Sequence, residues 1–218
     1  MQRKRKLAKP GVRDSQAEAA ARQRIVADAS SHFFTHGFRG VTMDDLAREL
    51  GMSKKTLYAH FDTKLQLLDA VIENKFRRVR EDFAGVLAAR RDFPEMLREF
   101  LDCVQRHTSA IQPPFLRDMR QEGPEVFQKI ERLRRAGIEQ YFGQLMRLGG
   151  SAGFIRDDIP PRLIIEILLA AVQAIVNPAH LEELGLTPKS ACALITKVVL
   201  EGALAPAGRA HLPSASSP

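Results

Sequence analysis

Several residue types and patterns are scarce in this sequence. It has no tryptophan, two tyrosines and only two cysteines among 218 residues. Cys103 and Cys192 lie far apart and form no disulfide framework, which suits a reducing cytoplasm. No run of 18 or more apolar residues occurs, so no membrane-spanning helix is expected. The basic N-terminus lacks a following apolar stretch, so we expect no secretory signal.

The alternating pattern of β-strands is also missing, and apolar residues recur at helical spacing throughout. We find no nucleophile elbow, phosphate-binding loop or cluster of metal ligands. These absences argue against an enzyme, and we predict no catalytic residue, no cofactor and no metal. An apolar content of 44% is sufficient for a core. The sequence therefore predicts an all-α protein.

The positive charge is concentrated at one end of the chain. Residues 1–13 contain six Lys or Arg and no acid, so most of the net charge of +7 lies there. A basic arm beside a folded domain indicates a polyanionic partner, and a merely solubilising disordered end is the alternative. Residues 206–218 are rich in Ala, Ser and Pro and also predict disorder.

Helix caps and breakers divide the rest of the chain. Thr42, Ser53 and Thr63 are placed as N-caps, with Asp45 and Gln66 three residues after the first and last of them. Gly and Pro clusters mark the later boundaries. The helices expected are 16–36, 43–50, 54–60, 64–87, 94–110, 114–121, 125–148, 161–176 and 188–204. Gly149-Gly150 is expected to end the seventh of them.

The stretch GMSKKTLYAHF, residues 51–61, has two distinct faces when drawn as a helix. At about 100° per residue, Leu57 and Phe61 fall on the inward side. The outward side and its flanks carry no acid: Lys55, Thr56, Tyr58, Ala59 and His60. With the preceding short helix, this forms a helix-turn-helix that presents its second helix to the major groove. Lys55 can donate to guanine and Thr56 can contact a base. A packed helical hairpin is the alternative.

Polar residues near helix starts suit phosphate groups. Thr42 offers its hydroxyl and the adjacent backbone N–H groups. Lys64 lies in the first turn of a helix, where the helix dipole disfavours a cation, and a nearby phosphate would explain it. Lys54 can extend its long stem toward a phosphate or a base.

The run GFRGVTMDDLARELGMSKKTLYAHFDTKLQLL resembles the N-terminal signature of the TetR/AcrR family of bacterial transcriptional regulators. The resemblance covers about 50 residues, with the first helix included. The remaining chain is similar only in its expected helices. The matching features are Gly37-Phe38, Thr42, Leu46-Ala47, Gly51-Met52-Ser53, Thr56-Leu57-Tyr58, His60-Phe61 and Lys64.

The resemblance implies a homodimeric repressor that binds a palindromic double-stranded DNA operator and is released by a small-molecule effector. An activator of the same fold and a sequence-tolerant DNA-coating protein are alternatives. The resemblance also implies a cytoplasmic protein that is associated with the nucleoid when it is bound to DNA. The residues implied to contact DNA are Thr42, Ser53, Lys54, Lys55, Thr56, Tyr58, His60 and Lys64. Relatives often have a small residue or proline at position 55, so Lys55 predicts a contact particular to this chain.

These inferences define four expected segments. They are a disordered basic arm at 1–14, a helix-turn-helix domain at 15–61, a helical regulatory and dimerisation domain at 62–205, and a disordered tail at 206–218. We expect Arg3, Lys4, Arg5 and Lys6 of the arm to add DNA affinity without sequence preference.

Two late segments, near 161–176 and 188–204, are apolar around most of their circumference. Such helices must be buried on more than one side. We predict that they pair across a two-fold axis as a four-helix dimer interface, and two central core helices are the alternative.

An effector pocket is expected in the second domain, where the family resemblance places it. Its candidate residues are Phe76, Phe83, Phe100, Cys103, His107, Phe115, Arg117 and Phe142. Aromatic residues at helical spacing more often belong to an ordinary core. Cys103 and His107 lie four residues apart, but two ligands do not make a zinc site.

Overall fold

The computed structural model describes residues 12–89, 91–122 and 124–209. In these ranges every regular element is a helix, apart from an isolated antiparallel bridge between Ile155 and Leu204. The elements are α1 (Val12–His36), α2 (Met43–Glu49), α3 (Lys54–His60), α4 (Lys64–Ala88), α5 (Phe93–Ser109), α6 (Pro113–Glu122), α7 (Pro124–Gly137), the π-helix η1 (Ile138–Phe142), α8 (Gly143–Ser151), α9 (Pro161–Ile175), α10 (Pro178–Glu183), α11 (Pro188–Ala203) and α12 (Pro206–Arg209). The prediction of an all-α protein is confirmed.

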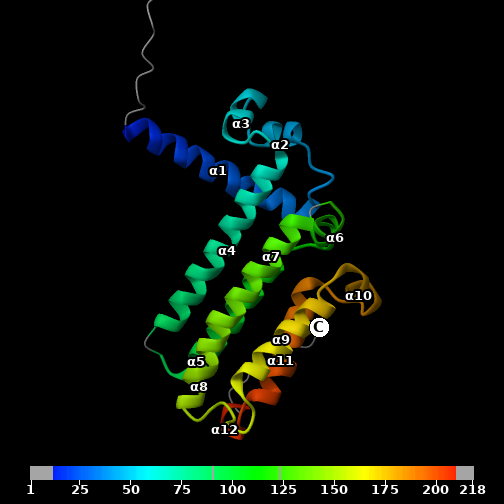
Figure 1. Ribbon diagram of the computed structural model, residues 1–218. Helices are drawn as coiled ribbons and strands as arrows, with labels where there is room; N and C mark the ends of the chain where they lie inside the picture. The colour runs from blue at the N-terminus through cyan, green and yellow to red at the C-terminus, as the bar shows by residue number, and fades with distance from the viewer. Residues whose placement is uncertain (1–11, 90, 123, 210–218) are drawn as a thin grey trace, which may run out of the picture.

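The helices form two regions along one long axis (Figure 1). Helices α1, α2 and α3 lie at one end, and α4 runs from them along the rest of the molecule. Helix α4 packs against both α5 and α7, and α9 packs against α11 on the side away from α4. None of the helices within the described ranges is long and apolar enough to cross a membrane.

Local sequence signals account for the helix-turn-helix. Thr42 caps α2, and its side chain and that of Asp45 form the expected capping box. The Ser53 hydroxyl accepts a hydrogen bond from the Thr56 backbone amide at 3.1 Å and so caps α3. Gly51 in the intervening turn has a φ of 63°, which a glycine adopts without a Cβ clash. The predicted caps at Thr42 and Ser53 are confirmed.

Two apolar cores hold the molecule together. The first contains Phe33, Leu46, Leu57 and other side chains of α1, α2 and α3. It continues into the first half of α4 and also takes in Phe115 and Met119 of α6. The first core therefore extends past residue 61, where the sequence suggests a domain boundary.

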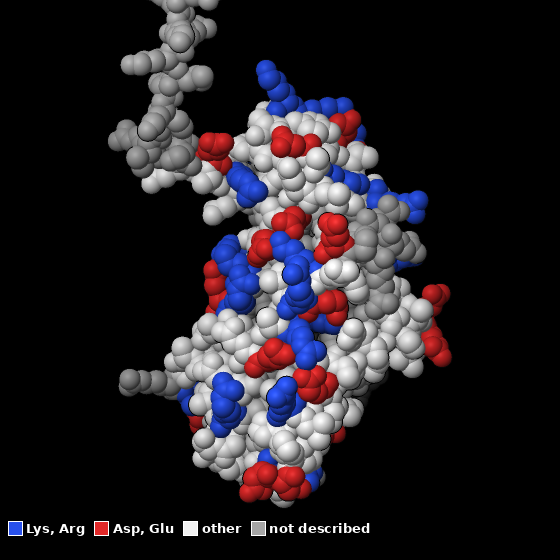
Figure 2. All heavy atoms as spheres, in the orientation of Figure 1, with Lys and Arg blue, Asp and Glu red and all other residues white. Residues whose placement is uncertain are grey.

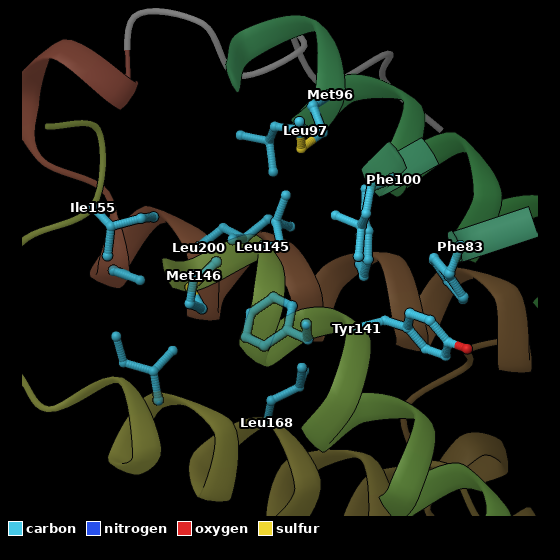
Figure 3. Packing of buried hydrophobic residues seen from close by; sticks show 14 of the residues in the cluster. Phe83, Met96, Leu97, Phe100, Tyr141, Leu145, Met146, Ile155, Leu168 and Leu200 are labelled. Carbon is cyan, nitrogen blue, oxygen red and sulfur yellow. The ribbon is translucent and has the colours of Figure 1, made fainter. Parts of the chain in front are cut away.

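The second core fills the regulatory region and joins helices distant in sequence. Figure 3 shows side chains from α5, α8, α9 and α11 converging, including Leu97, Leu145, Leu168 and Leu200. Burying one such side chain stabilises the folded protein by about 1.5–3 kcal/mol relative to leaving it exposed to water.

The expected helix 125–148 differs from the structure in two ways. It consists of α7, η1 and α8, and it continues to Ser151 through the Gly149-Gly150 pair. A Cβ added at Gly149 would collide with Phe93 and Ile155. Glycine is therefore needed at this position inside the helix, because these two side chains pack directly against its backbone. The prediction that the pair ends the helix is wrong.

The expected disordered segments also need correction. Residues 12–14 begin α1, and residues 206–209 form α12, so both predicted segments contain helix. Gly208 is buried, and a Cβ there would meet the Phe154 carbonyl, which shows that α12 packs on the domain. The arm residues Arg3, Lys4, Arg5 and Lys6 lie outside the described residues.

Candidate DNA-binding face and effector cavity

Helix α3 has the two faces that its sequence predicts. Leu57 and Phe61 are 0% and 1% exposed and anchor α3 in the first core. The Arg22 guanidinium lies over the Phe61 ring, 4.5 Å from its centroid, and fixes α1 against the end of α3. Every other residue of α3 is exposed or partly exposed, and Tyr58 is 45% exposed. The predicted inward pair is confirmed, and the outer side of α3 is free to approach a groove.

The two lysines of α3 have different surroundings. The Lys54 ammonium is paired with the Asp44 carboxylate of α2, and both side chains are largely exposed. Within the described residues, Lys55 is exposed and has no carboxylate partner. Figure 2 shows basic atoms at the upper edge of the molecule, over α2 and α3, with acidic atoms beside them. Lys55 is therefore the uncompensated cation of α3.

Thr42 and Lys64 have partners inside the protein. Thr42 donates its hydroxyl to the Asp45 carboxylate, and this hydrogen bond is the largest cause holding the pKa of Asp45 below 3.8. Lys64 donates to the backbone carbonyls of Phe38 and Val41 at 2.9 and 3.0 Å. Its ammonium also lies over the Phe38 ring, 4.3 Å from the centroid. Lys64 thus fastens the loop before α2, which explains a cation in this first turn without a phosphate.

A cavity of about 230 Å³ lies among α4, α5, α7 and η1, with α9 and α11 closing one side. Its wall is mostly apolar and rich in aromatic rings. Phe83 of α4 stacks with Tyr141 of η1 at 5.8 Å and lies 4.5 Å from Phe100 of α5, between ring centroids. Figure 3 shows these three rings approaching from three helices. Pockets of this kind usually bind small molecules.

Most of the residues suggested for the effector pocket line this cavity: Phe76, Phe83, Phe100, His107, Phe115 and Phe142. Cys103 and Arg117, which the sequence suggests beside them, do not. Cys103 is fully buried in the second core, and burial raises the pKa of its thiol to about 11. Arg117 is exposed on α6. Helical spacing could not distinguish the cavity wall from its surroundings.

Three polar side chains, Lys75, His107 and Asp82, contact one another in a row at the cavity wall. His107 Nε2 lies 2.9 Å from an Asp82 oxygen, and His107 Nδ1 lies 3.4 Å from Lys75 Nζ. Lys75 and His107 line the cavity, whereas Asp82 lies behind the imidazole. The pKa of His107 lies below its ordinary 6.5, chiefly because the imidazole is buried and next because the Lys75 charge is close. Burial likewise lowers the pKa of Lys75.

The ligand atoms of Asp82, Cys103 and His107 lie within 4.8 Å of one another, which is close enough for a metal ion. The hydrogen bonds of His107 disfavour this use. The Lys75 ammonium can only donate, so Nδ1 accepts and Nε2 carries the proton that it donates to Asp82. No lone pair of the neutral imidazole then remains for a metal. A lysine charge beside the cluster and a thiol pKa of about 11 oppose metal binding further.

An apolar face is exposed on the paired helices α9 and α11. On α9, Leu163 and Ile167 are 51% and 49% exposed. On α11, Leu194 and Val198 are 49% and 70% exposed. Both pairs lie one helical turn apart, and the two helices pack side by side. Large aliphatic side chains grouped in this way typically mark an interaction surface.

Comparison with known proteins identifies the family. Residues 25–71, which span α1 to the first half of α4, match the family model for bacterial regulatory proteins of the tetR family. TtgW of Pseudomonas putida, named as an uncharacterized HTH-type transcriptional regulator, is 33% identical over 94 residues, which are 43% of this chain and 70% of TtgW. The chain belongs to the TetR family. This TetR-family protein is a DNA-binding transcriptional regulator, not an enzyme.

Two further similarities bear on different parts of this TetR-family protein. SrpR of Pseudomonas putida, another HTH-type transcriptional regulator, is 33% identical over 94 residues, and the match covers 43% of this chain and only 44% of SrpR. A TetR transcriptional regulator from Chloroflexus aurantiacus has the same fold at 22% identity, with a TM-score of 0.59. That structural match covers 85% of this chain and 95% of the other.

The cavity of this TetR-family protein touches the core of its DNA-binding end. Phe34 of α1 and Phe115 of α6 line the cavity and also belong to the first core, with their rings edge to face at 5.0 Å. The backbone amide of Gln112 donates to the Phe34 carbonyl at 3.0 Å. A molecule in the cavity would therefore contact side chains that support α1.

The residues that sequence reasoning missed include Lys75 and Tyr141 on the cavity wall of this TetR-family protein and Asp82 behind it. Lys75 and Asp82 lie on α4 and meet His107 only because α4 packs against α5. Tyr141 reaches the cavity from the π-helix η1, whose wide turn no sequence pattern announces. The spacing of Lys75 and Asp82, seven residues or two helical turns apart, was the one available signal that they share a face of α4.

Proposed function

We propose that this protein is a homodimeric repressor that binds a palindromic operator and leaves it when a small molecule enters the cavity. The observation that carries the proposal is the outer side of α3. It projects polar and basic side chains away from the core while Leu57 and Phe61 hold the helix in place. A short helix so mounted fits the major groove of B-DNA.

We propose different roles for the polar residues of this face. Lys55 and Thr56 would contact base edges, because they lie near its exposed centre. Tyr58, His60, Ser53 and Thr42 would bind phosphates from its margins. Lys54 would bind a phosphate once its ion pair with Asp44 is broken. Lys64 would act mainly by holding the loop before α2 through its hydrogen bonds to the Phe38 and Val41 carbonyls.

The apolar face of α9 and α11 supports a dimer. Leu163, Ile167, Leu194 and Val198 would be covered by the same face of a second copy, related by a two-fold axis. Two α3 helices would then read two half-sites, which gives more specificity than one short helix provides.

The cavity supports release by an effector. We propose residues 15–61 as the DNA-reading unit and residues 62–205 as the regulatory and dimerisation unit, joined through α4 and α6. Occupation of the cavity would favour a different position of Phe34 and Phe115 and so shift α1 and the attached α3. An effector acts in this way only if it binds the released state more tightly than the DNA-bound state.

The test is selection of preferred sequences from random duplex DNA by the purified full-length protein at near-physiological salt. Recovery of an inverted repeat supports the proposal and supplies the operator. Recovery of DNA without a shared motif, combined with a steep dependence of affinity on salt, would support the sequence-tolerant DNA-coating alternative instead. Placing the recovered operator before a reporter gene then separates a repressor from an activator.

A further inference from the structure

The charged groups on the cavity wall are all potentially cationic. They are Lys75, Arg80, His107 and Arg134, whereas no Asp or Glu of the described residues lines the cavity. Two of these groups are already matched by acids behind the wall. His107 contacts Asp82, and Arg134 is paired with Glu131. The acids that balance the wall therefore point away from the space that a ligand would occupy.

Lys75 is not matched in this way. Its ammonium contacts the neutral Nδ1 of His107 at 3.4 Å and lies 5.8 Å from the centroid of the Phe34 ring. Within the described residues no carboxylate forms an ion pair with it, and the Asp82 charge on the far side of His107 only partly offsets the effect of burial. Lys75 is partly buried, and burial is the largest cause lowering its pKa. An ammonium placed against an apolar wall without an anion in contact with it loses hydration that the protein only partly replaces.

Bound molecules of different charge would meet this wall very differently. An anion beside Lys75 would form a charge-assisted hydrogen bond in a poorly hydrated site, where such bonds are strong. A cation would meet Lys75 and Arg80 with no carboxylate on the wall to receive it. An uncharged apolar molecule would fill the aromatic part of the cavity but leave the Lys75 ammonium unpaired. The wall thus discriminates by the sign of charge as well as by shape.

We infer that the effector is an amphipathic anion whose apolar body lies among the phenylalanine rings of α4, α5 and η1 and whose anionic headgroup binds Lys75. The inference rests on the proposed function, because it names the ligand class of the proposed effector cavity. His107 adds a second polar contact beside the headgroup, and Asp82 holds the imidazole in place.

The experiment uses three probes with the same eight-carbon chain: octanoate, octanol and protonated octylamine. Isothermal titration calorimetry measures the affinity of each for the full-length protein at neutral pH. We expect octanoate to bind about tenfold more tightly than octanol, which corresponds to one charge-assisted hydrogen bond, and octylamine to bind most weakly. Lys75→Met keeps the apolar stem and removes the charge, so it should abolish the preference for octanoate. Lys75→Arg should retain it.

Lys189→Met is the matched control, because Lys189 is exposed on α11 and does not line the cavity. It should leave all three affinities unchanged, and thermal melting confirms that each variant is folded. Equal binding of octanoate and octanol, or a preference that survives Lys75→Met, would overturn the inference while leaving an effector cavity in place. Failure of all three probes to bind would overturn both the cavity as an effector site and the inference about its ligand.

Discussion

The backbone amide of Arg39 donates a hydrogen bond to the carboxylate of Asp118 across 2.8 Å. The bond joins the loop after α1 to α6, and Asp118 is only 7% exposed. Gly37 lies beside it with a φ of 84°, and a Cβ there would collide with the Asp118 carboxylate. Because α6 also carries Phe115 into the cavity wall, this bond lies between the proposed effector site and the DNA-binding end.

Replacing Asp118 by Ala should destabilise the protein. The substitution removes the buried, charged acceptor of the Arg39 amide, and we expect a loss of about 1–3 kcal/mol in the free energy of unfolding. Urea denaturation monitored by circular dichroism measures the loss. Asp102→Ala is the control, since Asp102 is exposed on α5. Equal stability of the two variants would show that the Arg39–Asp118 bond contributes nothing.

Lys55→Ala should weaken operator binding by about tenfold or more and relax the preference at one base pair of each half-site. Lys54→Ala should have a smaller effect, because Lys54 must first leave Asp44. Fluorescence anisotropy with the selected operator and its single-base variants measures both. The assignment of Lys55 to a base would be wrong if its loss weakened binding equally for every sequence, since that is the behaviour of a phosphate contact.

Leu194→Glu should separate the proposed dimer into monomers. The side chain is 49% exposed in one protomer, so the substitution is tolerated by the fold but places charge in the proposed interface. Analytical ultracentrifugation measures the molecular mass in solution and so distinguishes dimer from monomer. The affinity for the operator should fall when the dimer is lost. Leu184→Glu is the matched control, because Leu184 is 53% exposed beyond the end of α10. A dimer that persists in Leu194→Glu would place the interface elsewhere.

His107 should make stability depend on pH. Its pKa in the folded protein lies below 6.5, chiefly through burial, so the unfolded chain binds more protons between that folded value and 6.5. Stability should therefore fall as the pH drops below about 6.5. His107→Gln should flatten this part of the profile. Urea denaturation at a series of pH values tests it, and an unchanged slope in His107→Gln would assign the effect to other groups.

The features predicted correctly from the sequence depend on residues close together in the chain. A capping box spans three residues, and the inward positions of Leu57 and Phe61 follow from one turn of helix. Such signals need no knowledge of the rest of the fold. They were sufficient for the helix-turn-helix, whereas the region of the aromatic cavity was suggested by the family resemblance.

The features that were missed depend on contacts between helices. The sequence suggests that the helix ends at Gly149, but this glycine is required because Phe93 and Ile155 pack against it. Lys64 looked free for a phosphate until two carbonyls of the preceding loop were found within hydrogen-bonding distance. Cys103 shares a helix face with His107, yet it lies in the core and not on the cavity wall. Each of these outcomes is decided by a partner far away in the sequence.

The wide turn of η1 sets the rotational phase between α7 and α8. A π-turn contains one residue more than an α-turn and usually sits within an otherwise regular helix. Winding residues 138–142 as a regular α-helix, with no residue removed, would rotate α8 by roughly 90–100° relative to α7. Leu145 and Met146, now buried, would then turn away from the second core. The additional residue of the π-turn keeps Tyr141 at the cavity while Leu145 and Met146 stay in the core, so we expect homologous chains with a regular helix here to be one residue shorter.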